Sequence, residues 1–154
     1  MARGHLNRWT RTSVEWNRKE YYDNMKIYIA SRFKDREKLL PIRDKIFAMG
    51  HAVVSSWLGE VSKPTQMTRD EFWRKLAQKD FQEISSADIL IRSVHQVSET
   101  GGASQEQGFA YGRHQNTLVW LVGNNGKPRC VFDTLADKHF STWDECLAEL
   151  KKYE

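Results

Sequence analysis

The sequence has few cysteines and no long apolar run. Its two cysteines, Cys130 and Cys146, are spaced neither as metal ligands nor as a redox motif. None of its apolar runs is long enough to cross a bilayer, and the opening residues, MARGHLNRWTRTSVEW, lack the apolar region of a signal peptide. The five histidines have no metal-ligand spacing. We therefore expect a cytoplasmic protein with no membrane contact, no metal and no other cofactor.

The charge is unevenly distributed along the 154 residues. The net charge is +4, and much of the excess precedes Met25. The basic residues there are Arg3, Arg8, Arg11, Arg18 and Lys19. We divide the chain into a basic N-terminal extension, residues 1–24, and one domain, residues 25–154. We favour a solvated extension; its interleaved tryptophans and tyrosines could instead form a nucleic-acid-binding arm, or pack on the domain or a neighbouring subunit.

From Met25 onward, short apolar segments alternate with helical patterns. The expected strands are residues 26–30, 51–57, 88–93, 116–123 and 129–132. Helices are expected between the early strands and at the end of the chain, and the pairs Thr68–Glu71 and Thr142–Glu145 cap two of them. The pattern predicts an α/β fold with a mainly parallel five-stranded sheet and helices on both faces. Ligands of such sheets bind at the carboxyl ends of the strands.

The stretch ETGGASQEQGFAYG, residues 99–112, places a glutamate on an apolar helix face. We expect Glu106 in the first turn of the third helix, on the same face as Phe109 and Ala110. A helix N-terminus favours negative charge, so this carboxylate should stay ionised even when partly buried. Such a carboxylate suits nucleophilic attack on an electrophilic carbon. From the helix alone we favour a simpler interpretation, in which Glu106 complements the helix dipole or closes a cap.

Asp80 is a second carboxylate in an apolar setting. It lies within the apolar stripe of the long second helix, and this stripe consists of Trp73, Leu76, Ala77 and Ile84. A carboxylate that faces the core is costly unless it is paired or functional. Asp80 is therefore either an aspartate satisfied by backbone donors or one of two acids that cleave a glycosidic bond.

Four segments together resemble the nucleoside 2-deoxyribosyltransferase superfamily, which includes the 2′-deoxynucleoside 5′-phosphate N-hydrolases. In chain order they are KIYIASRF, GHAVVSSW, AQKDFQEISSADILI and ETGGASQEQGFAYGRHQNTLVWLVG. The resemblance runs from Met25 to about Val122 and does not include the extension. It implies a flavodoxin-like (Rossmann-type) fold. It also implies a homodimer or higher homo-oligomer in which a neighbouring subunit completes the site.

The resemblance assigns roles to three residues. Glu106 matches the family nucleophile, which attacks C1′ of the sugar and forms a glycosyl–enzyme intermediate. Tyr28 matches the tyrosine that steadies this glutamate. Asp80 matches the aspartate that works near the leaving base.

The position six residues before Glu106 bears on the choice of substrate. Family transferases typically have an aspartate there, which grips the 5′-hydroxyl, whereas the nucleotide hydrolases have a serine that faces the 5′-phosphate. This chain has Thr100, whose hydroxyl tolerates a phosphate. Basic residues after the first strand could bind the phosphate, although an ordinary solvated loop is equally compatible with them. The expected substrate-binding residues are Ser31, Arg32, Lys34, Trp57, Thr100, Gly101, Gly102 and Ser104.

Two of the aromatic or imidazole side chains near these loops have simpler interpretations. Trp57 could stack on a base, but a tryptophan in the core or at its rim is commoner. His95 could touch the base, and we expect it at the surface.

These residues predict hydrolysis of the N-glycosidic bond of a (deoxy)nucleoside 5′-monophosphate, with water as the acceptor. Base exchange by a nucleoside 2-deoxyribosyltransferase is the first alternative. The second is a non-catalytic module on the same fold that binds nucleotides or nucleic acid.

Overall fold

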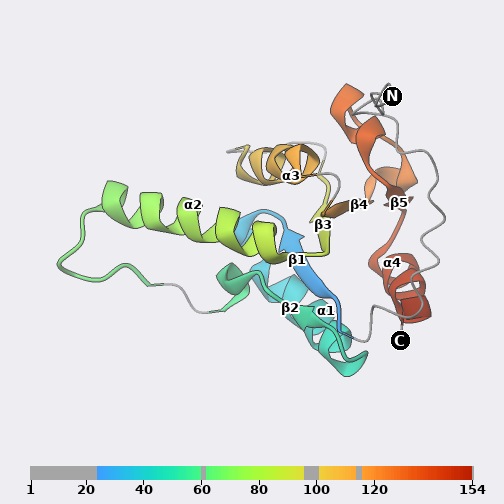
Figure 1. The fold of residues 1–154 in the computed structure, drawn as a ribbon, viewed down its shortest axis with the longest axis horizontal. Helices are drawn as coiled ribbons and strands as arrows, with labels where there is room; N and C mark the ends of the chain where they lie inside the picture. The colour runs from blue at the N-terminus through green and yellow to red at the C-terminus, as the bar shows by residue number, and fades with distance from the viewer. Residues whose placement is uncertain (1–23, 60–61, 96–100, 114–115, 154) are drawn as a thin grey trace, which may run out of the picture.

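A computed structural model describes residues 24–59, 62–95, 101–113 and 116–153, so the proposed extension lies almost entirely outside the described residues. Five strands form one sheet in the order β2-β1-β3-β4-β5, and every pair of neighbours is parallel (Figure 1). The strands are β1 (Lys26–Ala30), β2 (Ala52–Val53), β3 (Ile89–Ser93), β4 (Leu118–Val122) and β5 (Lys138–Phe140). The helices are α1 (Arg36–Ala48), α2 (Arg69–Ser86), α3 (Gly102–Gly112) and α4 (Trp143–Leu150). This strand order is that of flavodoxin-like folds.

Two strands differ from the sequence prediction. The second is shorter than residues 51–57, because Ser56–Leu58 form a 3-10 turn. The fifth is not residues 129–132: Val131–Leu135 form a 3-10 segment, η4, and the strand follows at β5. The carboxylate of Asp133 accepts hydrogen bonds from the backbone N–H and the guanidinium of Arg129, which closes the chain into a turn there.

Each face of the sheet carries its own core. α1 and α4 cover one face, and α2 and α3 cover the other (Figure 1). Alternate residues of β1 enter the two cores, because side chains of a strand point to opposite faces. Ile27 and Ile29 face α1 and α4, whereas Tyr28 and Ala30 face α2 and α3. The sheet therefore places the hydroxyl of a buried tyrosine under α2 and α3.

The long helix α2 begins as predicted but packs on the sheet over only part of its length. Thr68 Oγ1 accepts from Glu71 N–H at 3.2 Å, and Glu71 Oε2 accepts from Thr68 N–H at 2.9 Å, which confirms the capping box. The predicted apolar stripe is wrong in the first half, because the helix projects beyond the sheet (Figure 1). Trp73 there is 59% exposed, and Ile84 is the buried residue of α2.

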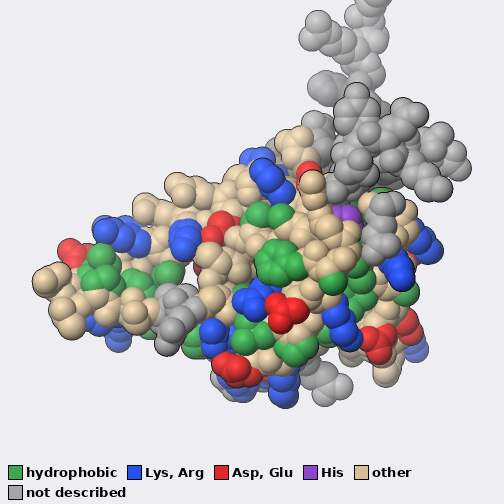
Figure 2. Space-filling model, turned by 90° about the horizontal axis from the view of Figure 1, so that it is seen from below, with side chains coloured by type: hydrophobic (Ala, Val, Ile, Leu, Met, Phe, Trp, Pro, Cys, Tyr) green, Lys and Arg blue, Asp and Glu red, His purple; other side chains and the backbone are tan. Residues whose placement is uncertain are grey.

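Hydrophobic side chains lie among basic ones on this projecting part of the molecule (Figure 2). Across the described part of the chain, no helix combines the length and the apolar character that a bilayer span requires.

Gly123 ends β4 in a backbone conformation that only glycine adopts readily. Its φ is +118°, and a Cβ atom there would lie 2.8 Å from the carbonyl oxygen of Val94. We expect Gly123→Ala to lower the free energy of unfolding by roughly 1–3 kcal/mol, measured by urea denaturation. Gly112→Ala is the matched control, because a Cβ at this position in α3 meets nothing within 4 Å. The control should lose no stability, and equal stability of the two variants would contradict the prediction.

Candidate active site

A buried tyrosine and a glutamate meet where β1 and α3 come together. Tyr28 Oη donates a hydrogen bond to Glu106 Oε1 at 2.9 Å, and the tyrosine side chain is fully buried. Burial, followed by the charge of Glu106, raises the pKa of Tyr28 far above its usual value. Tyr28 therefore stays protonated and acts as a fixed donor to the carboxylate.

Glu106 lies one turn further into its helix than predicted. α3 begins at Gly102, and its N-cap Gly101 has a left-handed φ of +72°, so Glu106 is in the second turn. The effect of a helix dipole falls off within the first turn. Burial raises the pKa of Glu106 to about 7, against the lowering effect of the Tyr28 hydrogen bond. The expectation that the helix start keeps this group ionised is therefore wrong, and near neutral pH it is about half protonated.

Asp80 faces the same tyrosine from α2. Burial, and then the charge of Glu83, raises the pKa of Asp80 to about 6, while a hydrogen bond with Tyr28 lowers it. Asp80 also raises the pKa of Glu106. The structure thus brings three of the predicted residues, Tyr28, Asp80 and Glu106, into one cluster, in which the charge of Asp80 helps to keep Glu106 protonated.

Glu83 is a third acid of this cluster that the sequence prediction missed. It follows Asp80 by three residues on α2, so both side chains lie on one helix face. Its Oε2 accepts from Ser56 N–H at 3.1 Å, and its charge raises the pKa of both Asp80 and Glu106. The three-residue spacing between Asp80 and Glu83 is the feature of the sequence that could have predicted this position.

In the loop after β1, Arg32, a predicted phosphate-binding residue, forms an ion pair with Asp35. Arg32 Nε donates to Asp35 Oδ2 at 2.8 Å, and its Nη2 donates to Asp35 Oδ1 at 3.1 Å. Asp35 is buried, and its hydrogen bonds with Arg32 lower its pKa. The Ser31 hydroxyl lies at the edge of this pair, 3.4 Å from Asp35 Oδ2, and Lys34 is exposed.

His95 is half-buried rather than at the surface as predicted. Its Nε2 lies 3.0 Å from Asp35 Oδ2 and 3.3 Å from Ser31 Oγ. Burial, and then the charge of Arg32, lowers the pKa of His95, so its imidazole is neutral near pH 7. His95 therefore ties the loop after β3 to the loop after β1.

The remaining predicted residues lie in different surroundings. Trp57 Nε1–H donates to the carbonyl of Ile29 at 2.7 Å, and the ring is partly buried against both cores. Gly101 and Gly102 form the start of α3, and Thr100 lies outside the described residues. Ser104 lines a cavity of about 340 Å³ on the flank of α3 opposite to Glu106.

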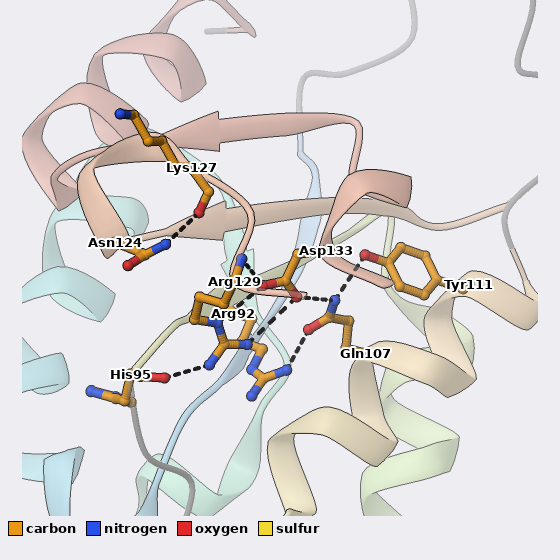
Figure 3. Close-up of polar contacts among 8 residues, drawn as sticks. All are labelled: Arg92, His95, Gln107, Tyr111, Asn124, Lys127, Arg129 and Asp133. Carbon is orange, nitrogen blue, oxygen red and sulfur yellow. Dashed lines mark hydrogen bonds and ion pairs between the residues drawn. The ribbon is translucent and has the colours of Figure 1, made fainter. Parts of the chain in front are cut away.

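A polar network that the sequence prediction missed lies beside that cavity. It joins Arg92, Gln107, Tyr111, Arg129 and Asp133 (Figure 3). The available signal was an arginine inside the apolar strand ILIRS.

The cluster as a whole can supply both a nucleophile and an acid. Two carboxyl groups with pKa values of about 6 and about 7 exchange protons near neutral pH. Within the described residues, no three His, Cys, Asp or Glu side chains are grouped as a metal ion would require.

Two solved structures share this architecture. A 2-deoxyribosyltransferase from Bacillus psychrosaccharolyticus is 19% identical with a TM-score of 0.65, over 79% of this chain and 90% of that one. A CMP N-glycosidase from Clostridium botulinum is 18% identical with a TM-score of 0.53, over 84% of this chain and 99% of that one. No family model and no curated protein matches the sequence. The two likenesses establish the fold, a parallel five-stranded α/β sheet.

The raised pKa of Glu106 makes stability depend on pH. The folded chain keeps a proton that the unfolded chain releases between about pH 4.5 and 7, so stability falls as the pH rises through this range. We expect Glu106→Gln to be more stable than the wild type at about pH 8, by roughly 1–3 kcal/mol, and to differ little at about pH 4.5. Urea denaturation at several pH values measures both differences.

The matched control is Asp144→Asn, which removes an exposed carboxylate from α4. Its free energy of unfolding, relative to the wild type, should not increase as the pH rises. If Glu106→Gln behaved in the same way, Glu106 would not be a destabilised buried acid.

Proposed function

We propose that the protein hydrolyses the N-glycosidic bond of a (deoxy)nucleoside 5′-monophosphate through a glycosyl–enzyme intermediate on Glu106. The observation that carries the proposal is the hydrogen bond from Tyr28 Oη to Glu106 Oε1, with the Asp80 carboxyl beside the same tyrosine. Retaining glycosidases use two carboxyl groups that flank the scissile bond, and Glu106 and Asp80 are candidates for this pair. The resemblance of the sequence, and the names of two proteins that share the fold, agree with this chemistry.

The reaction uses two steps at C1′ of the sugar. Ionised Glu106 attacks C1′ as the bond to the base breaks, and protonated Asp80 gives its proton to the leaving base. Water then attacks C1′, loses a proton to Asp80, and releases Glu106 and the sugar 5-phosphate. Tyr28 holds Glu106 in place in both steps.

The proton balance of the pair sets the pH range of activity. The productive form has one proton in total, on Asp80 rather than on Glu106. The pKa values of about 6 and about 7 mean that the pair holds one proton mainly between these pH values. Activity should therefore peak between about pH 6 and pH 7.

A phosphate-bearing substrate is supported by the basic side chains at the carboxyl end of β1. Arg32 and Lys34 lie in this loop, and the N–H groups at the start of α3 come from Gly101 and Gly102. The Arg32–Asp35 pair keeps the guanidinium in a fixed position at this edge of the sheet. We assign the phosphate to this side of the site, with Ser31 beside it.

A second copy of the chain is the partner that we propose for the outer face of α2 and α3. Phe81 of α2 stacks on Phe109 of α3 with ring centroids 4.3 Å apart, and Phe81 is 38% exposed. We define the apolar strip as the exposed rings of Trp73 and Phe81 on α2, with Phe109 of α3 stacked on Phe81. The resemblance of the sequence implies that a neighbouring subunit completes the site, and this strip is adjacent to Asp80.

Release of free base tests the reaction. Wild-type protein is incubated with dCMP, dGMP, dAMP and dTMP between about pH 5 and pH 9, and free base is measured by chromatography. We expect release from at least one nucleotide, with a maximum between about pH 6 and pH 7. Glu106→Gln should lower the rate by at least about 10³-fold, whereas the control Asp144→Asn should not change it.

Two further outcomes decide between the alternatives. If a free base is added and a nucleotide carrying the new base appears, the protein is a transferase. No base release from any nucleotide or nucleoside, together with salt-sensitive DNA binding that requires residues 1–24, would replace the enzyme with a binding module.

The mass of the protein in solution tests whether a second copy binds. We expect light scattering to give a multiple of the 18.1 kDa chain mass. Trp73→Glu should lower that mass, because it places a charge in the apolar strip. Phe47→Glu is the matched control on exposed α1 and should leave the mass unchanged. A wild-type protein of 18.1 kDa at micromolar concentration would contradict the proposal.

A further inference from the structure

Arg92 is a charged residue inside an otherwise apolar strand, and it is 4% exposed. In the register of the sheet Arg92 pairs with Ala30, and Leu90 pairs with Tyr28. Because alternate residues of a strand share a face, Arg92 lies on the same face of the sheet as Tyr28. This is the face under α3, from which Glu106 reaches the tyrosine.

The guanidinium of Arg92 binds the residue next to Glu106. Arg92 Nη1 donates to Gln107 Oε1 at 2.5 Å. Gln107 Nε2 in turn donates to Tyr111 Oη at 2.8 Å and to Asp133 Oδ1 at 3.1 Å (Figure 3). The Nε atom of Arg92 is buried and has no hydrogen-bond partner among the residues that the structure describes. Neutral hydrogen bonding therefore only partly compensates this buried cation.

The carboxylate of this network, Asp133, is paired with a second arginine, Arg129. Arg129 Nε and its backbone N–H both donate to Asp133 Oδ2 at 3.0 Å. Bonds from Arg129 and Gln107 lower the pKa of Asp133 to about 2 despite burial, so it is ionised and paired. Arg129 Nη1 also donates to the carbonyl of His95 (Figure 3). Among the residues that the structure describes, Arg92 therefore donates to the neutral amide of Gln107 rather than to a carboxylate.

Among the charged residues that affect Glu106, acidic side chains outnumber basic ones. Tyr28 of β1 donates to Glu106, whose ionisation also responds to the charges of Asp80 and Glu83 on α2 and of Arg92 on β3. The two acids on α2 oppose ionisation of Glu106, whereas Arg92 favours it. Arg92 is buried and Glu106 is half-buried, and opposite charges in such surroundings stabilise each other over several ångströms.

We propose that Arg92 is a positioning residue for Glu106: its buried charge favours the ionised carboxylate, and its bond to Gln107 fixes the turn of α3 that carries it. The catalytic consequence rests on the function proposed above. The electrostatic part does not, because it concerns the ionisation of Glu106 in the free protein.

A purely structural role for Arg92 makes different predictions. In that case Arg92 would act only through its hydrogen bond to Gln107, and replacing either residue would have the same effect. The matched pair is therefore Arg92→Met, which removes the charge and the bond, and Gln107→Met, which removes the bond and keeps the charge. Arg92→Lys keeps the charge on a different donor and serves as the variant that should still fold.

The titration of Glu106 can be read directly by NMR of protein labelled with 13C at the glutamate carboxyl carbons. Its signal is the one absent from Glu106→Gln. The midpoint should lie near pH 7 in the wild type. In Arg92→Met it should rise by roughly one pH unit, because a cation close to the carboxylate is lost. In Gln107→Met and Arg92→Lys it should stay near the wild-type value.

The kinetic consequence is a loss of rate that depends on pH. If the midpoint of Glu106 rises by about one pH unit, kcat/KM of Arg92→Met should fall about tenfold at pH 6 and match the wild type at pH 9. The loss disappears at high pH because Glu106 is then ionised in both proteins. Arg92→Lys should recover most of the rate at pH 6.

The outcomes separate this inference from the proposed function. A midpoint that does not move in either Arg92 variant, or that moves equally in Gln107→Met, overturns the electrostatic role. A loss of rate that is the same at every pH overturns the catalytic consequence. If the wild type releases no base at all, the proposed function fails, and the NMR titration still decides whether Arg92 controls Glu106.

Discussion

The hydrogen bond between Tyr28 and Glu106 joins the two halves of the site. β1 fixes the tyrosine in the core, so its hydroxyl has one position. The Glu106 carboxylate that accepts its hydrogen bond is therefore partly desolvated. Desolvation then keeps a proton on Glu106 up to about pH 7, and the same effect acts on Asp80. Two partly buried acids with raised pKa values destabilise the folded chain at neutral pH.

Much of the architecture could be predicted because it depends on local pattern. Short apolar strands between helices indicate a parallel sheet, and Thr68 with Glu71 marks the start of α2. The structure also brings Asp80 and Glu106 to Tyr28, as the family resemblance implies, and the residue pattern had marked the two acids beforehand. Their apolar neighbours were the signal, since an acid on such a face needs a reason to be there.

What could not be predicted depends on contacts between side chains. Residues 129–132 have the apolar character of a strand, but the bond from Arg129 to Asp133 turns the chain at that point. Glu106 was predicted in the first turn of α3, but the helix begins at Gly102, so Glu106 lies just beyond that turn. The position of Arg92 under α3 follows from the register of β3 against β1, and a single sequence does not contain that register.

The long helix α2 has one further consequence. Its last turns rest on the sheet, while its first turns extend beyond it (Figure 1). An α-helix is stiff, so the 18 residues of α2 move together. Asp80 and Glu83 lie on α2, whereas Glu106 lies on α3. A molecule that binds the free end of α2 can therefore change the distance between Asp80 and Glu106 without touching either residue.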